Sequence, residues 1–140
     1  MINYNYELDF TVPDETIYTE WIESVIVSES KDLGEISYIF CNDAYLLEIN
    51  QQYLDHDTLT DIISFDYTEG TVISGDIFIS VERVQENALE FNIPFEEELK
   101  RVMIHGVLHY CGYKDKSEAE ELLMRSKEDE KIKMFHVKHN

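Results

Sequence analysis

The sequence predicts an α+β fold, in which a small mixed four-stranded sheet packs with about five helices. The first residues alternate apolar and polar side chains, which is the period of a half-buried strand. Several later segments repeat apolar residues at helical spacing. Two apolar runs, residues 61–67 and 75–80, are separated by a short polar segment and predict a hairpin. Strands and helices therefore both occur, with one antiparallel pair.

The chain begins with a predicted strand over residues 2–8 and a helix after Pro13. The helix is indicated by four residues that share one helical face: Ile17, Trp21, Val25 and Ser28. Residues 31–34 supply a basic side chain and a glycine, so we expect the helix to end there.

A second strand and helix follow. Residues 36–41 are rich in β-branched and aromatic side chains, and Asn42 with Asp43 can cap a helix that runs to about Leu54. Crossovers through these two helices favour parallel strand pairing, and the hairpin adds the antiparallel pair. Thr68, Glu69 and Gly70 form the expected hairpin loop.

Three helices are predicted in the second half of the chain. Ser80 can cap a helix that ends before Pro94. Residues 96–98 are acidic, which favours a helix N-terminus, and Gly112 is expected to close that helix. Ser117 and Glu120 form a capping-box pattern for a last helix reaching about residue 135. Four residues mark its expected inner face: Ala119, Leu122, Leu123 and Ser126.

Length and charge narrow the class of protein. With 140 residues, we expect a single domain spanning 1–140. The N-terminal residues lack a signal-peptide pattern and the two cysteines lack CxxC spacing, so a cytoplasmic protein without a membrane partner is expected. The formal charge of −19 disfavours a broad nucleic-acid-binding surface, which leaves only a local basic path near residues 100–116.

The segment from His105 to Asp115 contains the candidate metal ligands. Residues four apart on a helix share a face, so His105 and His109 can both bind one metal ion. Gly112 then lets the chain turn back and bring Asp115 to the ion as a third ligand. Imidazole and carboxylate ligands suit Zn²⁺, without excluding other divalent metals, and three protein ligands leave the fourth position open, as in catalytic sites.

The spacing HxxxHxxGxxD resembles that of the metzincin proteases, which supports Asp115 as a ligand. Metzincins require a glutamate directly after the first histidine as general base, but Gly106 occupies that position here. A metalloprotease is therefore the least favoured reading.

Three ordered motifs resemble those of the YbeY family of endoribonucleases. HGVLHYCGYKD, from His105 to Asp115, matches the family's HGxLHLxGYDH. TDIISF at 60–65 and GDIFIS at 75–80 match its TD/NVLSF and GDIxIS elements. The resemblance implies a single-domain α+β fold, with His105 and His109 as zinc ligands. It also implies a zinc-dependent endoribonuclease for single-stranded RNA that acts in 16S ribosomal RNA 3′-end maturation and ribosome quality control. The implied partners are ribosomal RNA and the small subunit, and no DNA is expected.

The sequence departs from the family pattern at two positions. Asp115 replaces the usual third histidine, and Leu54 replaces an arginine suited to phosphate contact. We expect His56, Lys114 or Lys116 to compensate in substrate binding, with His56 also a candidate catalytic residue. Asp61 and Asp76 are further candidates for a general base.

Two other function classes are kept as alternatives. The missing arginine and the negative charge favour a non-catalytic, zinc-containing ribosome-assembly or RNA-binding factor. A metalloprotease remains the third.

Overall fold

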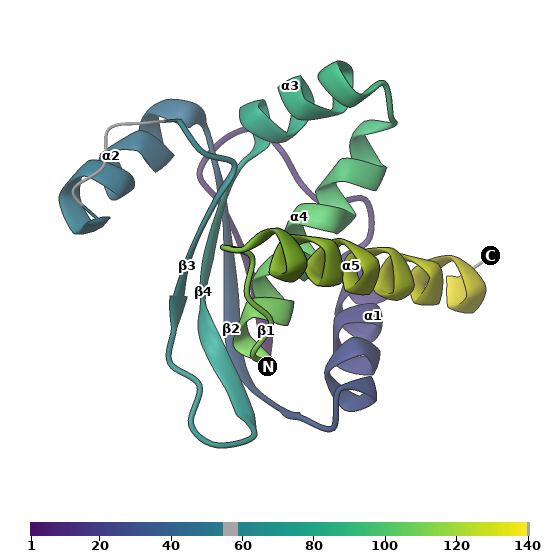
Figure 1. The fold of residues 1–140 in the computed structure, drawn as a ribbon. Coiled ribbons are helices and arrows are strands. Elements are labelled where there is room, and N and C mark those ends of the chain that lie inside the picture. Colours follow the sequence, from purple (N-terminus) through teal and green to yellow (C-terminus); the bar gives the residue numbers. More distant parts are fainter. Residues whose placement is uncertain (55–58, 140) are drawn as a thin grey trace.

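The protein is described by a computed structural model that covers residues 1–54 and 59–139, with side chains through residue 136. Four strands and five helices occur in these residues, and Figure 1 shows their arrangement. Their bounds are β1 (Ile2–Tyr6), α1 (Glu15–Ser28), β2 (Asp32–Cys41), α2 (Asp43–Leu54), β3 (Ile62–Asp66), β4 (Val72–Ser80), α3 (Val81–Phe91), α4 (Phe95–Tyr110) and α5 (Glu118–His139). The predicted α+β class is confirmed.

The four strands form one mixed sheet in the order β1-β2-β4-β3. β2 pairs in parallel with both β1 and β4, and β3 pairs antiparallel with β4. The hairpin and the mixed character of the sheet are as predicted. The strand that follows α2 in sequence is β3, but the parallel neighbour of β2 is β4, which lies between β2 and β3.

Helices cover both faces of the sheet unequally. α1, α4 and α5 lie on one side and α2 lies on the other (Figure 1). The main core fills the first side, where Trp21, Tyr38 and Met103 are among the fully buried side chains. A smaller apolar cluster around Leu46 and Ile63 lies beneath α2. The helix that carries the histidine motif, α4, is therefore packed into the larger core.

The predicted helix caps are formed by side chains of the expected residues. Ser80 Oγ accepts a hydrogen bond from the Arg83 amide at the start of α3. Ser117 and Glu120 exchange both bonds of a capping box, since each backbone amide donates to the other side chain. These local bonds satisfy amides that a helix N-terminus leaves without partners.

The expected end of the first helix is wrong. α1 ends at Ser28, Ser30 takes a positive φ of 58°, and Asp32 already begins β2. Gly34 is a strand residue whose role is close packing, because a Cβ there would overlap Ser74 Oγ of β4. The glycine therefore permits strand contact and does not stop the helix.

The expected inner face of the last helix is also wrong. Leu122 and Leu123 are 68% and 52% exposed, whereas Met124 and Ile132 of α5 are buried. Lys131 is buried on the same face, and its ammonium lies 2.8 Å from a Glu29 carboxylate oxygen. Hydrophobicity predicts that the two leucines face the core, but they are exposed. The face of α5 that is buried includes Lys131, which is paired with Glu29.

Among the described residues, no helix has both the length and the apolar character that crossing a membrane would require.

Candidate metal centre

α4 holds the two motif histidines rigidly against the sheet. Its side chains Met103, Val107 and Leu108 are fully buried in the main core. Tyr110 crosses over Gly75 of β4, and its hydroxyl lies 2.9 Å from the Phe65 carbonyl and 3.1 Å from that of Asp76. The orientation of α4 is therefore tied to the hairpin.

The turn after α4 brings Asp115 back to the histidines. Gly112 has a φ of +108°, which residues with a Cβ rarely adopt. The Tyr113 amide donates to the Leu108 carbonyl at 3.1 Å, as expected for a glycine-terminated helix. The predicted role of Gly112 is confirmed.

Three potential ligand atoms meet at this turn. His105 Nε2 lies 2.9 Å from His109 Nε2 and 3.1 Å from Asp115 Oδ2. His109 Nε2 lies 3.2 Å from the same Asp115 oxygen. Among the described residues, this is the only group of three or more His, Cys, Asp or Glu side chains close enough to share a metal ion.

The Nδ1 atoms of both histidines have hydrogen-bond partners, which place the ring protons on Nδ1 and not on Nε2. His109 Nδ1 lies 2.9 Å from the Tyr113 carbonyl oxygen, which can only accept, so Nδ1 carries the proton. His105 Nδ1 lies 2.6 Å from Glu128 Oε2, an arrangement that assigns the His105 proton to Nδ1 in the same way. In the neutral imidazoles, both Nε2 atoms then present lone pairs to each other and to a carboxylate oxygen. Three convergent acceptors fit a divalent cation, and this donor set suits zinc.

Glu128 is the functional residue that the sequence motifs did not reveal. It is buried on α5, and Arg101 donates to its other oxygen at 2.9 Å while also binding Asp129 at 2.7 Å. A carboxylate behind a ligating histidine orients the ring and raises its basicity. Burial lowers the pKa of His105, but the hydrogen bond and charge of Glu128 outweigh it, so the pKa lies above its ordinary value. No motif spacing links Glu128 to His105, because the contact depends on how α5 packs on α4.

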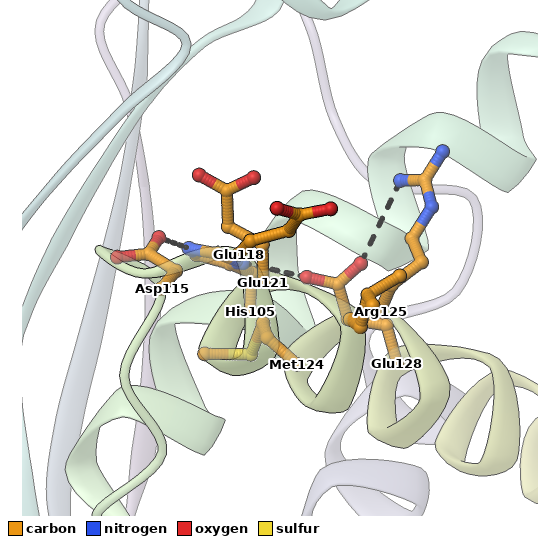
Figure 2. Close-up of a pocket in the computed structure, with 8 residues that line it drawn as sticks. His105, Asp115, Glu118, Glu121, Met124, Arg125 and Glu128 are labelled. Atoms are coloured by element: carbon orange, nitrogen blue, oxygen red, sulfur yellow. Dashed lines mark hydrogen bonds and ion pairs between the residues drawn. The ribbon is translucent and has the colours of Figure 1, made fainter.

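A cavity of about 430 Å³ opens beside His105 and Asp115. Figure 2 shows its lining, with Asp115 and Glu128 on opposite sides of His105 and Arg125 extending from α5. Two exposed carboxylates, Glu118 and Glu121, also line it. The space next to the candidate metal ligands is therefore polar and mixed in charge.

The remaining candidate residues are placed less uniformly. Lys114 and Lys116 are exposed and flank Asp115, but neither lines this cavity. His56 lies outside the residues that the structure describes. Asp61 lines a second cavity together with His105, whereas Asp76 lines a separate aromatic pocket with Tyr67. Of the two acidic candidates for a general base, only Asp61 shares a cavity with a candidate metal ligand.

Two of the four cations near the motif, Lys100 and Arg101, make internal contacts. Lys100 is buried with its ammonium 4.1 Å from the centre of the Phe135 ring. Arg101 is held by its two carboxylate partners. Arg125, whose side chain is 58% exposed, is the guanidinium that remains accessible at the cavity.

Gly106 faces the sheet and not the ligand side of α4. It is buried, and a Cβ on it would lie 2.9 Å from Ile77 Cδ1. A side chain at this position would enter the core, so the position directly after His105 has no room for a general base.

Comparison with known proteins identifies the family. The family model described as endoribonuclease YbeY matches residues 3–136. The endoribonuclease YbeY of Flavobacterium psychrophilum is 73% identical over 140 residues, which is 100% of both chains. That of Flavobacterium johnsoniae is 69% identical over 137 residues, covering 98% of this chain and 99% of its own. The solution structure of TM1509 from Thermotoga maritima has a TM-score of 0.73 and 29% identity, with 99% of this chain and 91% of that chain covered. The chain therefore belongs to the endoribonuclease YbeY family.

Proposed function

We propose that the protein is a zinc-dependent endoribonuclease of one domain that hydrolyses single-stranded RNA in the cytoplasm. Its proposed substrate is the 3′ end of 16S ribosomal RNA in the small subunit, with a role in ribosome quality control. The observation that carries this proposal is the convergence of three acceptor atoms, from His105, His109 and Asp115, in a chain of the endoribonuclease YbeY family. One zinc ion per chain is the proposed cofactor.

The chain's own residues hold and orient the reacting groups. A bound zinc ion supplies Lewis-acid polarisation of a phosphoryl oxygen and of water. Glu128 and the Tyr113 carbonyl accept hydrogen bonds from the two Nδ1 atoms, which orients both Nε2 atoms toward the ion. Arg125 offers a guanidinium to the RNA backbone from the cavity wall, beside the proposed contacts of Lys114 and Lys116. These cations supply the phosphate contact for which the family's usual arginine is absent at Leu54.

The test combines metal content with RNA cleavage. Wild type, His105→Ala and Asp115→Ala are assayed for bound zinc and for cleavage of an unstructured RNA. Wild type should bind one zinc ion per chain, lose cleavage in a chelator and regain it with zinc. Both variants should lose zinc and activity together. Full zinc occupancy and cleavage in Asp115→Ala would remove Asp115 from the ligand set.

A non-catalytic ribosome-assembly or RNA-binding factor is the second candidate. It is favoured by the carboxylates Glu118 and Glu121 in the cavity wall, since they repel a phosphate from the metal centre, which cleavage requires it to reach and RNA binding does not. The same RNA assay separates the two functions. Zinc-dependent binding of ribosomal RNA without any cleavage would support the factor and contradict the enzyme.

A further inference from the structure

A second cavity, of about 260 Å³, lies on the other side of His105 from Asp115's turn. It is built from four elements, because Asp61 precedes β3, Asn87 and Phe91 come from α3, Glu98 comes from α4, and Arg125 comes from α5. His105, Arg125 and Glu128 line both this cavity and the one beside the metal ligands. A group bound in the second cavity would therefore be a direct neighbour of a group bound at the metal centre.

Glu98 is the unusual residue in this cavity. The side chain is only 4% exposed, and its Oε1 is the one buried side-chain oxygen or nitrogen in the described part of the chain that has no hydrogen-bond partner. Such an atom costs free energy unless a ligand satisfies it. Burial and the nearby Asp61 carboxylate raise the pKa of Glu98 to about 7. An acceptor without a partner thus faces a cavity beside the proposed reaction centre.

The cavity is not arranged for a second metal ion. The carboxylates of Asp61, Glu98 and Glu128 do not form a ligand cluster, since the metal-ligand group found among the described residues contains none of them. Two guanidinium groups, of Arg101 and Arg125, also line the space and would repel a cation. The contents expected are a neutral, polar group.

Phe91 adds an apolar wall to this polar space. Its side chain is 51% exposed at the end of α3, although its helical spacing would favour burial. An exposed aromatic ring beside hydrogen-bonding groups is the arrangement that binds an unstacked nucleobase, with the ring face for stacking and the polar groups for the base edge. The cavity volume is large enough for one base.

We propose that this cavity is a base-recognition subsite, in which Glu98 accepts hydrogen bonds from the nucleobase adjacent to the scissile phosphate and Phe91 stacks on it. The inference rests on the proposed function, because it places the metal centre at the phosphate of the same RNA. The Glu98 acceptor without a partner requires a base edge with N–H donors. Guanine fits best, because its N1–H and N2–H donors lie side by side and match one carboxylate. Uracil fits worst, because carbonyl oxygens flank its single N–H.

Cleavage of short RNAs tests the subsite. All-uridine RNAs are compared with RNAs that carry one guanosine at successive positions around the cut, at pH 8, where Glu98 is ionised. Wild type should cleave with a kcat/KM on the order of tenfold higher when guanosine occupies one flanking position. Glu98→Ala should lose this preference, and Glu98→Gln should keep only part of it, because the Gln amide oxygen can accept a hydrogen bond but the amide nitrogen cannot. Phe91→Ala should raise the KM for both RNAs, since an aromatic ring stacks on any base.

Glu96→Gln is the matched control, because Glu96 is an exposed glutamate of the same helix that does not line the cavity. It should retain the guanosine preference. Wild-type cleavage that is indifferent to guanosine at every flanking position would overturn the subsite, and so would a preference that persists in Glu98→Ala.

A binding measurement separates failure of the subsite from failure of the proposed function. Guanosine and uridine 5′-monophosphates, which contain no bond for an endoribonuclease to cut, are titrated into zinc-loaded wild type and Glu98→Ala by calorimetry. If no RNA is cleaved but wild type binds the guanosine nucleotide more tightly and Glu98→Ala does not, the enzyme proposal fails and the subsite stands. Equal affinities for both nucleotides in wild type would exclude the subsite.

Discussion

Glu128 Oε2 lies 2.6 Å from His105 Nδ1, so a residue of α5 sets the tautomer of a proposed metal ligand on α4. The contact joins two helices that the chain connects only through the Asp115 turn. Arg101 neutralises part of the buried charge by donating to the other Glu128 oxygen. The proposed metal site and the packing of the last helix are therefore one unit, and disturbance of either should affect the other.

Removal of Glu128 should weaken zinc binding without removing a ligand. Glu128→Ala is expected to lower zinc affinity about 10- to 100-fold, since outer partners of ligating histidines have effects of this size. Glu128→Gln should lose less, because its amide oxygen can still accept from Nδ1. Competition with a chromophoric chelator measures both. Asp129→Asn is the control, because Asp129 binds the same Arg101 but not His105. Equal losses in the control and in Glu128→Ala would attribute the effect to helix packing.

Substitution of Asp115 should distinguish a ligand from a neighbour. Asp115→Asn keeps the size of the side chain but replaces an anionic oxygen by a poor zinc donor, so zinc affinity should fall by at least about 100-fold. Asp115→His restores the third histidine usual in the family and should retain zinc. The rise in melting temperature on adding zinc reports both affinities. The ligand assignment fails if Asp115→Asn is stabilised by zinc as strongly as wild type.

Local signals carried the predictions that the structure confirms. His105 and His109 share a helix face because of their spacing alone, and Ser117 with Glu120 forms a capping box within four residues. Each of these features depends on a short stretch of backbone. A periodic pattern or a cap can therefore identify them before any tertiary structure is known.

Features that depend on distant parts of the chain could not be predicted. β4 lies between β2 and β3 because of the way the strands pair. The local sequence of β3 does not predict this pairing. Lys131 of α5 is buried because it pairs with Glu29, the residue that follows α1. The two residues are 102 positions apart in sequence. Hydrophobicity alone would place such a lysine outside and Leu122 inside. The role of Glu128 could not be predicted for the same reason, since it depends on a contact with His105 of another helix.

An added methyl group at Gly75 should strongly destabilise the protein. A Cβ there would overlap the Phe65 carbonyl and the Tyr110 ring, and the carbonyl is backbone that cannot move away alone. Gly75→Ala is expected to lower the free energy of unfolding by about 3 kcal/mol, as measured by urea denaturation. Gly106→Ala should cost less, because its Cβ would meet only the ends of the Ile77 and Ile62 side chains. A Gly75→Ala protein as stable as Gly106→Ala would contradict close packing of Tyr110 on β4.

The buried Glu98 should make stability fall as pH rises. Burial, followed by the Asp61 charge, raises its pKa in the folded state from 4.5 to about 7. Between these two values the folded protein holds a proton that the unfolded chain has released, so the free energy of unfolding decreases with rising pH through this window and the loss is complete above it. The loss is up to about 3 kcal/mol for this single group. Urea denaturation of the zinc-free protein at pH 5 and pH 8 measures it.

Glu98→Gln isolates this contribution, since Asp61 is also shifted upward by burial and acts in the same direction. The variant should lose less stability than wild type between pH 5 and pH 8, and should be the more stable of the two at pH 8. Glu96→Gln, at an exposed position of α4, should keep the wild-type dependence. Identical pH dependence in wild type and Glu98→Gln would mean that Glu98 is solvated in the folded protein. The second cavity would then lack the acceptor that the base-recognition subsite requires.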